Sequence, residues 1–416
     1  MEHRANGESV KVLLVHNSYQ LPGGEDGVYQ RERDLLRASG DEVVEYWRTN
    51  KEIENYPLTQ RLMLGFRTVW SSDSRSQFAE VLKSSRPDIV HVHNTFMVIS
   101  PSIYSACRDQ HVPVVQTLHN YRLLCPGANF SRDGKPCHDC TSNLGHSILH
   151  GCYRGSRAST ASVAMMLAWH RSTGTYENLI DRYIALTEFS RSNFVAAGMD
   201  PSKITVKPNF VYSDPGERNT AGSYALFVGR IEEQKGLRTL LDAWRKLPEP
   251  VPLRLAGTGP LVDELRTVAA TMPHIQYLGQ LPLDELMQTM RGARFLVFPS
   301  QLYENFPLTL AEAYACGVPV IASELGAMKE IVLDGRTGLL FRPSDADDLA
   351  QKVSFAWRNR DLLTQFGKQA RQEYETKYTA EQNYRMLRNI YDTVLAKRRR
   401  SEVLAETRNA KEVVPV

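Results

Sequence analysis

Two glutamates eight residues apart, Glu304 and Glu312, are the side chains of this sequence best placed to do chemistry. Pro307 lies between them and Gly317 follows, and these two residue types favour a helix start and a helix end respectively. We therefore predict a helix over residues 308–316, with Glu304 in the loop before it. Free backbone amides at a helix N-terminus attract anions. Carboxylates beside such a site indicate a ligand with both phosphate and hydroxyl groups, such as a nucleotide sugar.

A pair of cations, Arg230 and Lys235, lies in the segment FVGRIEEQKG at residues 227–236. Arg230 ends an apolar run that reads as a strand, and Lys235 comes just before an expected helix. Cations in this position neutralise a diphosphate, which matters most when charge builds on it as a leaving group. The alternative is ordinary ion pairing on the surface, which is common for any arginine and lysine.

Apolar runs that read as strands alternate with helical patterns through both halves of the chain. This rhythm is typical of parallel sheets covered by helices on both faces, and 416 residues suffice for two such domains. We predict an α/β fold of two doubly wound Rossmann-like domains facing across a cleft, with ligands at the carboxyl ends of the strands. The expected strands are 12–15, 43–47, 89–93, 114–118 and 183–187, then 225–229, 253–256, 275–278, 295–298 and 318–322.

The residues around the two glutamates resemble the signature of the family-4 retaining glycosyltransferases, which have the GT-B architecture. NFP at residues 305–307 follows the first glutamate, and GVPV at residues 317–320 follows the second. The resemblance implies that Glu304 and the backbone amides after it approach a donor sugar, and that Glu312 binds the nucleotide ribose. It covers both halves of the chain.

The same resemblance implies roles for residues in other segments. A glycine pair is in most proteins only a turn, and a lone histidine after a strand is most often a structural hydrogen-bond partner. In this family the corresponding positions contact the donor. The expected set is His119 and the backbone of Asn305, Phe306 and Leu308 on the donor sugar, Arg230 and Lys235 on the pyrophosphate, Gly23 and Gly24 in a flexible loop over the donor phosphate and acceptor, and Gly257 and Gly259 near the nucleotide.

The resemblance also implies a division of the chain. We expect residues 1–208 to form an acceptor-binding domain with a cysteine-rich insertion at 120–160. Residues 209–375 are expected to bind the nucleotide sugar. Residues 376–416 are expected to form a helix that packs back on the first domain, followed by a basic tail.

The expected reaction is transfer of a sugar from a nucleotide diphosphate sugar to a hydroxyl acceptor, with the anomeric configuration retained. The expected acceptor is a glycan or a lipid-linked glycan of cell-surface or exopolysaccharide synthesis. No cofactor is expected for catalysis, because Arg230 and Lys235 supply the positive charge that a divalent ion supplies elsewhere. Two alternatives remain: a nucleotide-sugar epimerase on the same fold, and a zinc-containing binding protein without catalysis on a transferase scaffold.

Four of the six cysteines fall within 28 residues, with the spacing Cys-x11-Cys-x2-Cys-x11-Cys. In a reducing compartment such a cluster indicates a metal rather than disulfides, and four thiolates form a closed structural zinc site. An iron–sulfur cluster or unliganded thiols are the alternatives, and the neighbouring histidines are possible substitutes for one ligand. The expected ligands are Cys125, Cys137, Cys140 and Cys152.

Charge and hydropathy restrict the partners of the chain. A formal charge of +3 over this length does not indicate nucleic acid as a partner. Residues 1–16 carry no long apolar core, and no segment is apolar enough to span a bilayer, so we expect a cytoplasmic protein that can lie at the inner face of the membrane. The basic and apolar segment 61–70 is compatible with a helix at a lipid surface, although a core-facing helix is the favoured interpretation.

Overall fold

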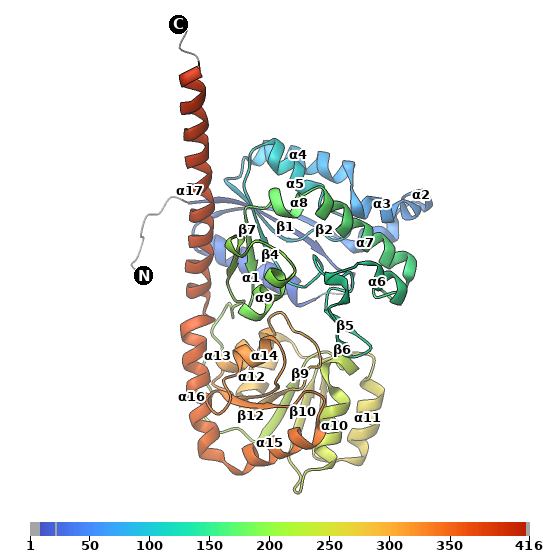
Figure 1. The fold of residues 1–416 in the computed structure, drawn as a ribbon. Coiled ribbons are helices and arrows are strands. Elements are labelled where there is room, and N and C mark those ends of the chain that lie inside the picture. Colours follow the sequence, from blue (N-terminus) through green and yellow to red (C-terminus); the bar gives the residue numbers. More distant parts are fainter. Residues whose placement is uncertain (1–8, 21–22, 413–416) are drawn as a thin grey trace.

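The computed structural model describes residues 9–20 and 23–412, so residues 1–8, which enter the expectation about a leader peptide, lie outside it. Two six-stranded parallel sheets, each flanked by helices, form the two halves of the molecule (Figure 1). The predicted fold of two doubly wound Rossmann-like domains is therefore confirmed.

The first sheet has the strand order β2-β1-β3-β4-β7-β8. Its residues alternate between two cores, as period-two side chains on a doubly covered sheet must. Leu13 and Val15 pack on one face, and Val12 and Leu14 on the other. The strands are β1 Lys11–Ser18, β2 Glu42–Thr49, β3 Ile89–Asn94, β4 Val114–Thr117, β7 Arg182–Ala185 and β8 Ile204–Val206; the covering helices are α1 Gly24–Ala38, α4 Ser72–Ser85, α5 Ile103–Asp109, α8 Thr175–Asn178 and α9 Glu188–Ala196.

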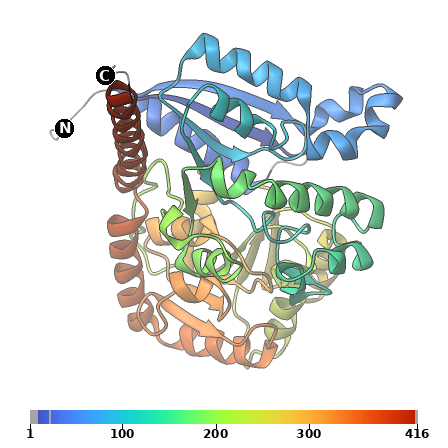
Figure 2. The same cartoon turned by 45° about the horizontal axis from the view of Figure 1, so that its top comes forward.

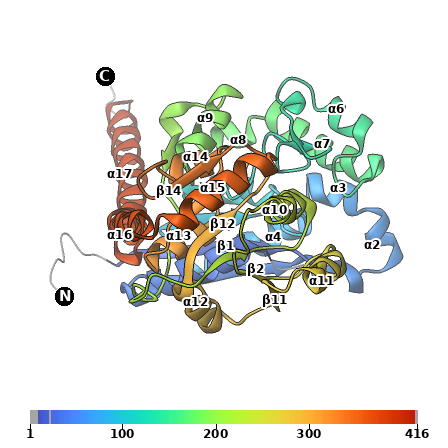
Figure 3. The ribbon, with the colours of Figure 1, turned by 90° about the horizontal axis from the view of Figure 1, so that it is seen from below.

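The second sheet has the order β11-β10-β9-β12-β13-β14 and the same two-sided packing, with Leu226 on one face and Phe227 on the other. Figure 3 looks onto this domain from below. Strands β8 and β14 are not among the predicted ones, because each is too short to show a clear period. The elements are β9 Tyr224–Val228, β10 Leu253–Ala256, β11 Ile275–Gly279, β12 Ala293–Phe298, β13 Val320–Ser323 and β14 Gly338–Phe341, with α10 Leu237–Arg245, α11 Val262–Thr271, α12 Leu283–Gly292, α13 Leu308–Ala315, α14 Ala327–Ile331, α15 Ala346–Arg358 and α16 Arg360–Lys377.

The long helix α17, Ala380–Glu412, leaves the second domain and runs along the edge of the first (Figures 1 and 2). Leu387, Ile390 and Tyr391 of this helix are buried in the core that includes β1 and α1. The chain thus crosses between the domains twice. The two crossings touch, because the Val211 N–H donates a 3.0 Å hydrogen bond to the Tyr378 carbonyl.

The segment 61–70 departs from its favoured interpretation. It is divided at Met63 between two short helices, α2 Leu58–Leu62 and α3 Leu64–Val69. α3 packs closely on α7, Arg157–Ser172, because a Cβ atom on Gly65 would lie 2.7 Å from the Ser162 hydroxyl. Only the end of α3 faces the core; the apolar side chains at Met63 and Phe66 are more than half exposed, at 54% and 62%. Across the described residues, no helix combines the length and apolar content needed to cross a bilayer.

The cysteine-rich insertion forms a small lobe on the first domain. It contains the hairpin β5 Ser131–Arg132 and β6 Lys135–Pro136 and the short helix α6 Gly145–His150. In Figure 1 the hairpin hangs from the first domain toward the second. Aromatic contacts continue this direction, since the His138 ring lies 4.6 Å from Phe130 in the lobe and 5.5 Å from Tyr303 in the second domain. The lobe therefore touches both domains.

Candidate active site

A cavity of about 550 Å³ lies between the domains, at the carboxyl ends of both sheets. Its walls contain most of the residues that the sequence singled out. The first domain contributes Gly23, Gly24 and His119, and the second contributes Arg230, Lys235, Glu304, Asn305, Phe306 and Leu308.

Lys235 and Glu304 form the charged centre of this cavity. The Lys235 Nζ donates to Glu304 Oε1 at 2.6 Å, and the Ser300 hydroxyl donates to the same oxygen at 2.7 Å. Arg230 is largely exposed and lies 3.4 Å from Glu232. The first amides of α13 open on the cavity, since Leu308 and Thr309 line it. Two cations and a helix N-terminus together form a site for an anion.

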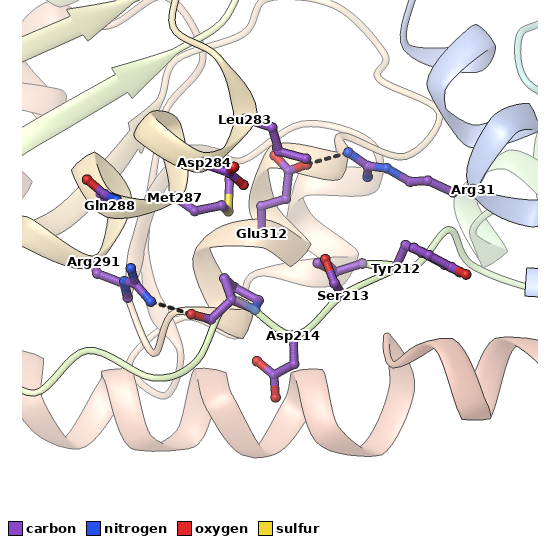
Figure 4. A pocket seen from close by; sticks show the side chains of 12 residues that line it. Arg31, Tyr212, Ser213, Asp214, Leu283, Asp284, Met287, Gln288, Arg291 and Glu312 are labelled. Carbon is purple, nitrogen blue, oxygen red and sulfur yellow. Dashed lines mark hydrogen bonds and ion pairs between the residues drawn. The ribbon is translucent and has the colours of Figure 1, made fainter. Parts of the chain in front are cut away.

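Glu312 lies beside a second, adjoining cavity of about 480 Å³. It is on α13, and its side chain is 8% exposed. Burial raises the pKa of Glu312, and Arg31 of the first domain opposes this shift. The Arg31 Nη2 donates to Glu312 Oε1 at 3.2 Å across the domain boundary (Figure 4). Leu283, Met287 and Asp214 are among its other lining residues, so the cavity combines apolar and polar walls.

Asn305 connects the two domains inside the cleft. Its Nδ2 donates to the carbonyl of Leu118, the residue before His119, and its own carbonyl accepts a 3.2 Å hydrogen bond from the Thr187 hydroxyl. The Asn305 Oδ1 is buried without a hydrogen-bond partner among the described residues. The expected contact with a donor sugar thus falls on a residue that also fixes how the domains approach each other.

Gly257 and Gly259 line neither of these two cavities as the described residues define them. Backbone packing explains both glycines. A Cβ atom on Gly257 would lie 1.9 Å from the Gly229 carbonyl oxygen, and one on Gly259 would lie 2.4 Å from that of Ile231. The loop after β10 must therefore press directly on the loop that carries Arg230.

The cavity residues that the sequence reasoning missed include Tyr19, Glu25, Asn120 and Arg122. Glu25 is on the first turn of α1, where its oxygens accept hydrogen bonds from Asn94 Nδ2 at 2.9 Å and Asn120 Nδ2 at 3.2 Å. Burial raises the pKa of Glu25 to about 7, against the opposing influence of His16. The sequence signal was the position of Glu25 directly after the glycine pair.

His119 is in contact with a second histidine. Its Nε2 lies 2.9 Å from His93 Nδ1, and the two rings are stacked with their centroids 5.0 Å apart. Burial lowers the pKa of His93 to about 4 and holds the pKa of His119 well below its usual value. Both rings are therefore neutral at pH 7.

The four clustered cysteines lie in one lobe, and two of them are in contact. A hydrogen bond between the thiols of Cys125 and Cys140 lowers the pKa of Cys125, and burial raises the pKa of Cys152 with Cys125 and Cys137 nearby. No three of their sulfur atoms lie within 4.8 Å of one another. Among the described residues, three metal-ligand atoms lie within 4.8 Å of one another only at Glu32, His91 and His93.

Family models, related sequences and solved structures were compared with this chain, and they agree with the two-domain fold. Residues 32–214 match the family model "Glycosyltransferase Family 4", and residues 212–373 match "Glycosyl transferases group 1". The chain is 26% identical over 411 residues to the phosphatidyl-myo-inositol mannosyltransferase of Mycobacterium leprae, covering 92% of this chain and 96% of that protein. It is 33% identical to an uncharacterized glycosyltransferase of Methanocaldococcus jannaschii over 41% of this chain and 48% of that protein, so this match spans less than half of the relative. HepE of Anabaena, solved in complex with UDP, has a TM-score of 0.66 at 17% identity, over 92% of this chain and 100% of HepE.

The two family matches adjoin and together span most of the chain, and the fold has the two facing parallel sheets of GT-B proteins. The protein belongs to the GT-B glycosyltransferases. Within them it combines an N-terminal family 4 domain with a C-terminal group 1 domain.

The raised pKa of Glu25 predicts a pH dependence of stability. Its pKa is about 7 in the folded protein and near 4.5 when the chain is unfolded. Between these values the folded state binds more protons, so the free energy of unfolding falls as pH rises from about 5 to about 7. Urea unfolding at several pH values should show a smaller fall for Glu25→Gln than for the wild type. Glu54→Gln, at an exposed glutamate, is the control; equal pH profiles for wild type and Glu25→Gln would contradict the assignment.

Proposed function

We propose that the protein transfers a sugar from a nucleotide diphosphate sugar to a hydroxyl acceptor, with retention of the anomeric configuration. The observation that carries the proposal is the convergence of Arg230, Lys235, Glu304 and the α13 N-terminus in one interdomain cavity. Such a cluster stabilises a diphosphate leaving group at the moment its charge increases. The proposed donor lies with its diphosphate at this cluster.

Each proposed donor contact follows from position in the cavities. The diphosphate takes Arg230, Lys235 and the first amides of α13, and in doing so separates Lys235 from Glu304, which becomes free to accept from sugar hydroxyls. The ribose takes Glu312 in the adjoining cavity and displaces Arg31 from it. His119 faces the sugar from the first domain. Donor binding therefore exchanges two ion pairs within the protein for contacts with the ligand.

Retention and the chemical class of the donor rest on resemblance to relatives. The Glu-x7-Glu element resembles that of retaining enzymes, a related protein is called a mannosyltransferase, and a similar structure holds UDP. We propose a uridine or guanosine diphosphate hexose as donor, and a glycan or lipid-linked glycan as acceptor. An epimerase on the same fold is the rival; it would isomerise the donor in water with no acceptor present.

Loss of Lys235 tests the proposal. Lys235→Ala removes the half-buried cation of the cluster, so transferase kcat should fall by about 100-fold to 1,000-fold, as for other single electrostatic stabilisers of a transition state. Arg238→Ala, which removes an exposed cation of α10 outside the cavity, is the matched control and should remain near the wild-type rate. The measurement is sugar transfer from a panel of uridine and guanosine diphosphate sugars, with the anomeric configuration of the product read by proton NMR. Wild-type turnover in Lys235→Ala, or an inverted product, would refute the corresponding part of the proposal.

We further propose that α2, α3 and α7 touch a lipid surface, which would bring a lipid-linked acceptor to the cleft. These helices lie together at one end of the first domain (Figure 1). Six apolar side chains on these helices and directly after α2 and α3 are at least 39% exposed, and Arg61 of α2 and Arg157 of α7 are exposed as well. Apolar and basic residues on one face are typical of helices that bind anionic membranes. The exposed side chains are Leu58, Met63, Phe66, Trp70, Met165 and Trp169.

Sedimentation with phosphatidylglycerol vesicles tests this surface. The double variant Phe66→Ser, Trp169→Ser should bind at least about 10-fold more weakly than the wild type, since each large apolar side chain contributes roughly 1.5 to 3 kcal/mol when buried. Phe355→Ser changes a similarly exposed phenylalanine of α15 in the second domain and should have no effect. Equal binding by the double variant, or no binding by the wild type, would exclude the surface.

We also propose that the cysteine lobe binds a structural zinc ion. The support is the donor set: four thiols in one small lobe, two of them already in contact. When bound, zinc would cross-link the lobe, whose hairpin and short helix have little apolar core of their own. The candidate ligands remain Cys125, Cys137, Cys140 and Cys152.

Elemental analysis tests the zinc proposal. The purified protein should contain about one zinc per chain, and Cys140→Ser should lose it and lower the melting temperature. Cys316→Ser changes a buried cysteine of the second domain, outside the lobe, and this variant should keep the metal. Iron with visible absorption would indicate a cluster instead. Metal-free protein with four thiols that react under native conditions would contradict any metal site.

A further inference from the structure

A buried chain of polar groups leads from the core of the first domain to His119. Glu32 of α1 and His93 of β3 are 1% and 3% exposed. Glu32 Oε1 lies 3.1 Å from His93 Nε2, and His93 Nδ1 lies 2.9 Å from His119 Nε2. His119 in turn lines the cavity assigned to the donor. The three side chains thus connect the interior to the cleft.

The charge of Glu32 is secured from its other side. Although burial raises its pKa, Lys207 and His91 hold the pKa of Glu32 well below its usual value, so it is a carboxylate. Lys207 Nζ donates to Glu32 Oε2 at 2.8 Å and to Asn383 Oδ1 of α17 at 3.0 Å. A metal ion on Glu32, His91 and His93 would have to compete with this ammonium group, so the cluster is better described as a hydrogen-bonded network.

The hydrogen bonds that link Glu32, His93 and His119 can be donated in only one direction, toward Glu32. A carboxylate accepts but cannot donate, so His93 must carry its proton on Nε2 to satisfy Glu32. Glu32 Oε1 also lies 3.1 Å from His91 Nδ1, but His93 Nε2 has no polar contact other than Glu32 among the described residues. An unprotonated nitrogen that faces a buried carboxylate at this distance would be repelled by it and left unpaired, which is costly. His93 Nδ1 is then an acceptor, and it must receive a proton from His119 Nε2. The other nitrogen of His119, Nδ1, is left without a proton.

We propose that Glu32 and His93 are positioning residues that fix His119 as its Nε2–H tautomer, so that His119 Nδ1 accepts a hydrogen bond from a hydroxyl of the bound sugar. The consequence for turnover rests on the proposed function, whereas the tautomer is a property of the free protein. In a functional histidine, the hydrogen bond made by one ring nitrogen usually decides whether the other nitrogen carries a proton. Here the controlling carboxylate acts through a second ring.

Nitrogen-15 NMR of the histidine-labelled protein at pH 7, without substrate, tests the tautomer. His119, assigned from the spectrum of His119→Asn, should show a protonated Nε2 and an unprotonated Nδ1. His93→Leu should abolish this preference. His93→Asn, whose amide oxygen can replace Nδ1 as acceptor, should restore most of it. Tyr391→Phe removes the 2.7 Å contact of Tyr391 with His91 in the same buried network and should leave the His119 signals unchanged.

Kinetics of the same variants separate positioning from general damage to the fold. His93→Leu should lower kcat on the order of 10-fold, the effect of one lost hydrogen bond, while Tyr391→Phe stays near the wild type and His93→Asn recovers. A wild-type His119 protonated on Nδ1, or an unchanged tautomer in His93→Leu, would overturn the inference. If His119→Asn abolishes transfer and His93→Leu does not reduce it, the positioning role fails while the proposed function stands. If the wild type shows the expected tautomer but transfers no sugar, the proposed function fails while the tautomer assignment stands.

Discussion

Three buried or partly buried charge pairs lie in and beside the region between the two sheets, and in each the opposite charges are a few ångströms apart. Lys235 faces Glu304 at 2.6 Å, Arg31 faces Glu312 at 3.2 Å, and Lys207 faces Glu32 at 2.8 Å. A half-buried ion without a partner would destabilise the folded protein by several kcal/mol, roughly, so these pairs are a condition of folding. A ligand with a diphosphate and hydroxyl groups can replace the first two ion pairs with its own contacts to the same side chains. The third pair is fully enclosed and remains in place.

The fold was accessible from the sequence because its signals are local. Alternating apolar runs and helical patterns give the two sheets, and Pro307 and Gly317 bound α13 within a residue of its observed ends. The cation pair and the first glutamate were also predictable, since each belongs to a compact motif beside a strand end. In the two main sheets, β8 and β14 were missed because their three and four residues include Thr205 and Gly338 and so give no clear apolar run. The two-residue strands β5 and β6 are too short to give any pattern.

The remaining parts of the site depend on contacts between distant residues. Arg31 reads as a surface residue of α1, and nothing near it indicates a partner 281 positions away. The pKa of Glu25 is raised by burial, which depends on the folded surroundings. Gly257 and Gly259 are required because the backbone of a neighbouring loop lies too close for a side chain. The segment 61–70 illustrates the opposite error: its apolar content predicted burial, but the close packing of Gly65 on α7 turns much of that content outward.

The hydrogen bond between Val211 and Tyr378 restricts how the two domains can move relative to each other. Because both covalent links between the domains pass through the same small region, neither can lengthen or slide independently of the other. At these links, relative motion of the domains is then mainly rotation about a pivot near that contact. One wall of the cavity beside Glu312 begins at this contact, because Val211 lines it, so a small change of backbone angle there translates into a larger displacement at the opposite rim.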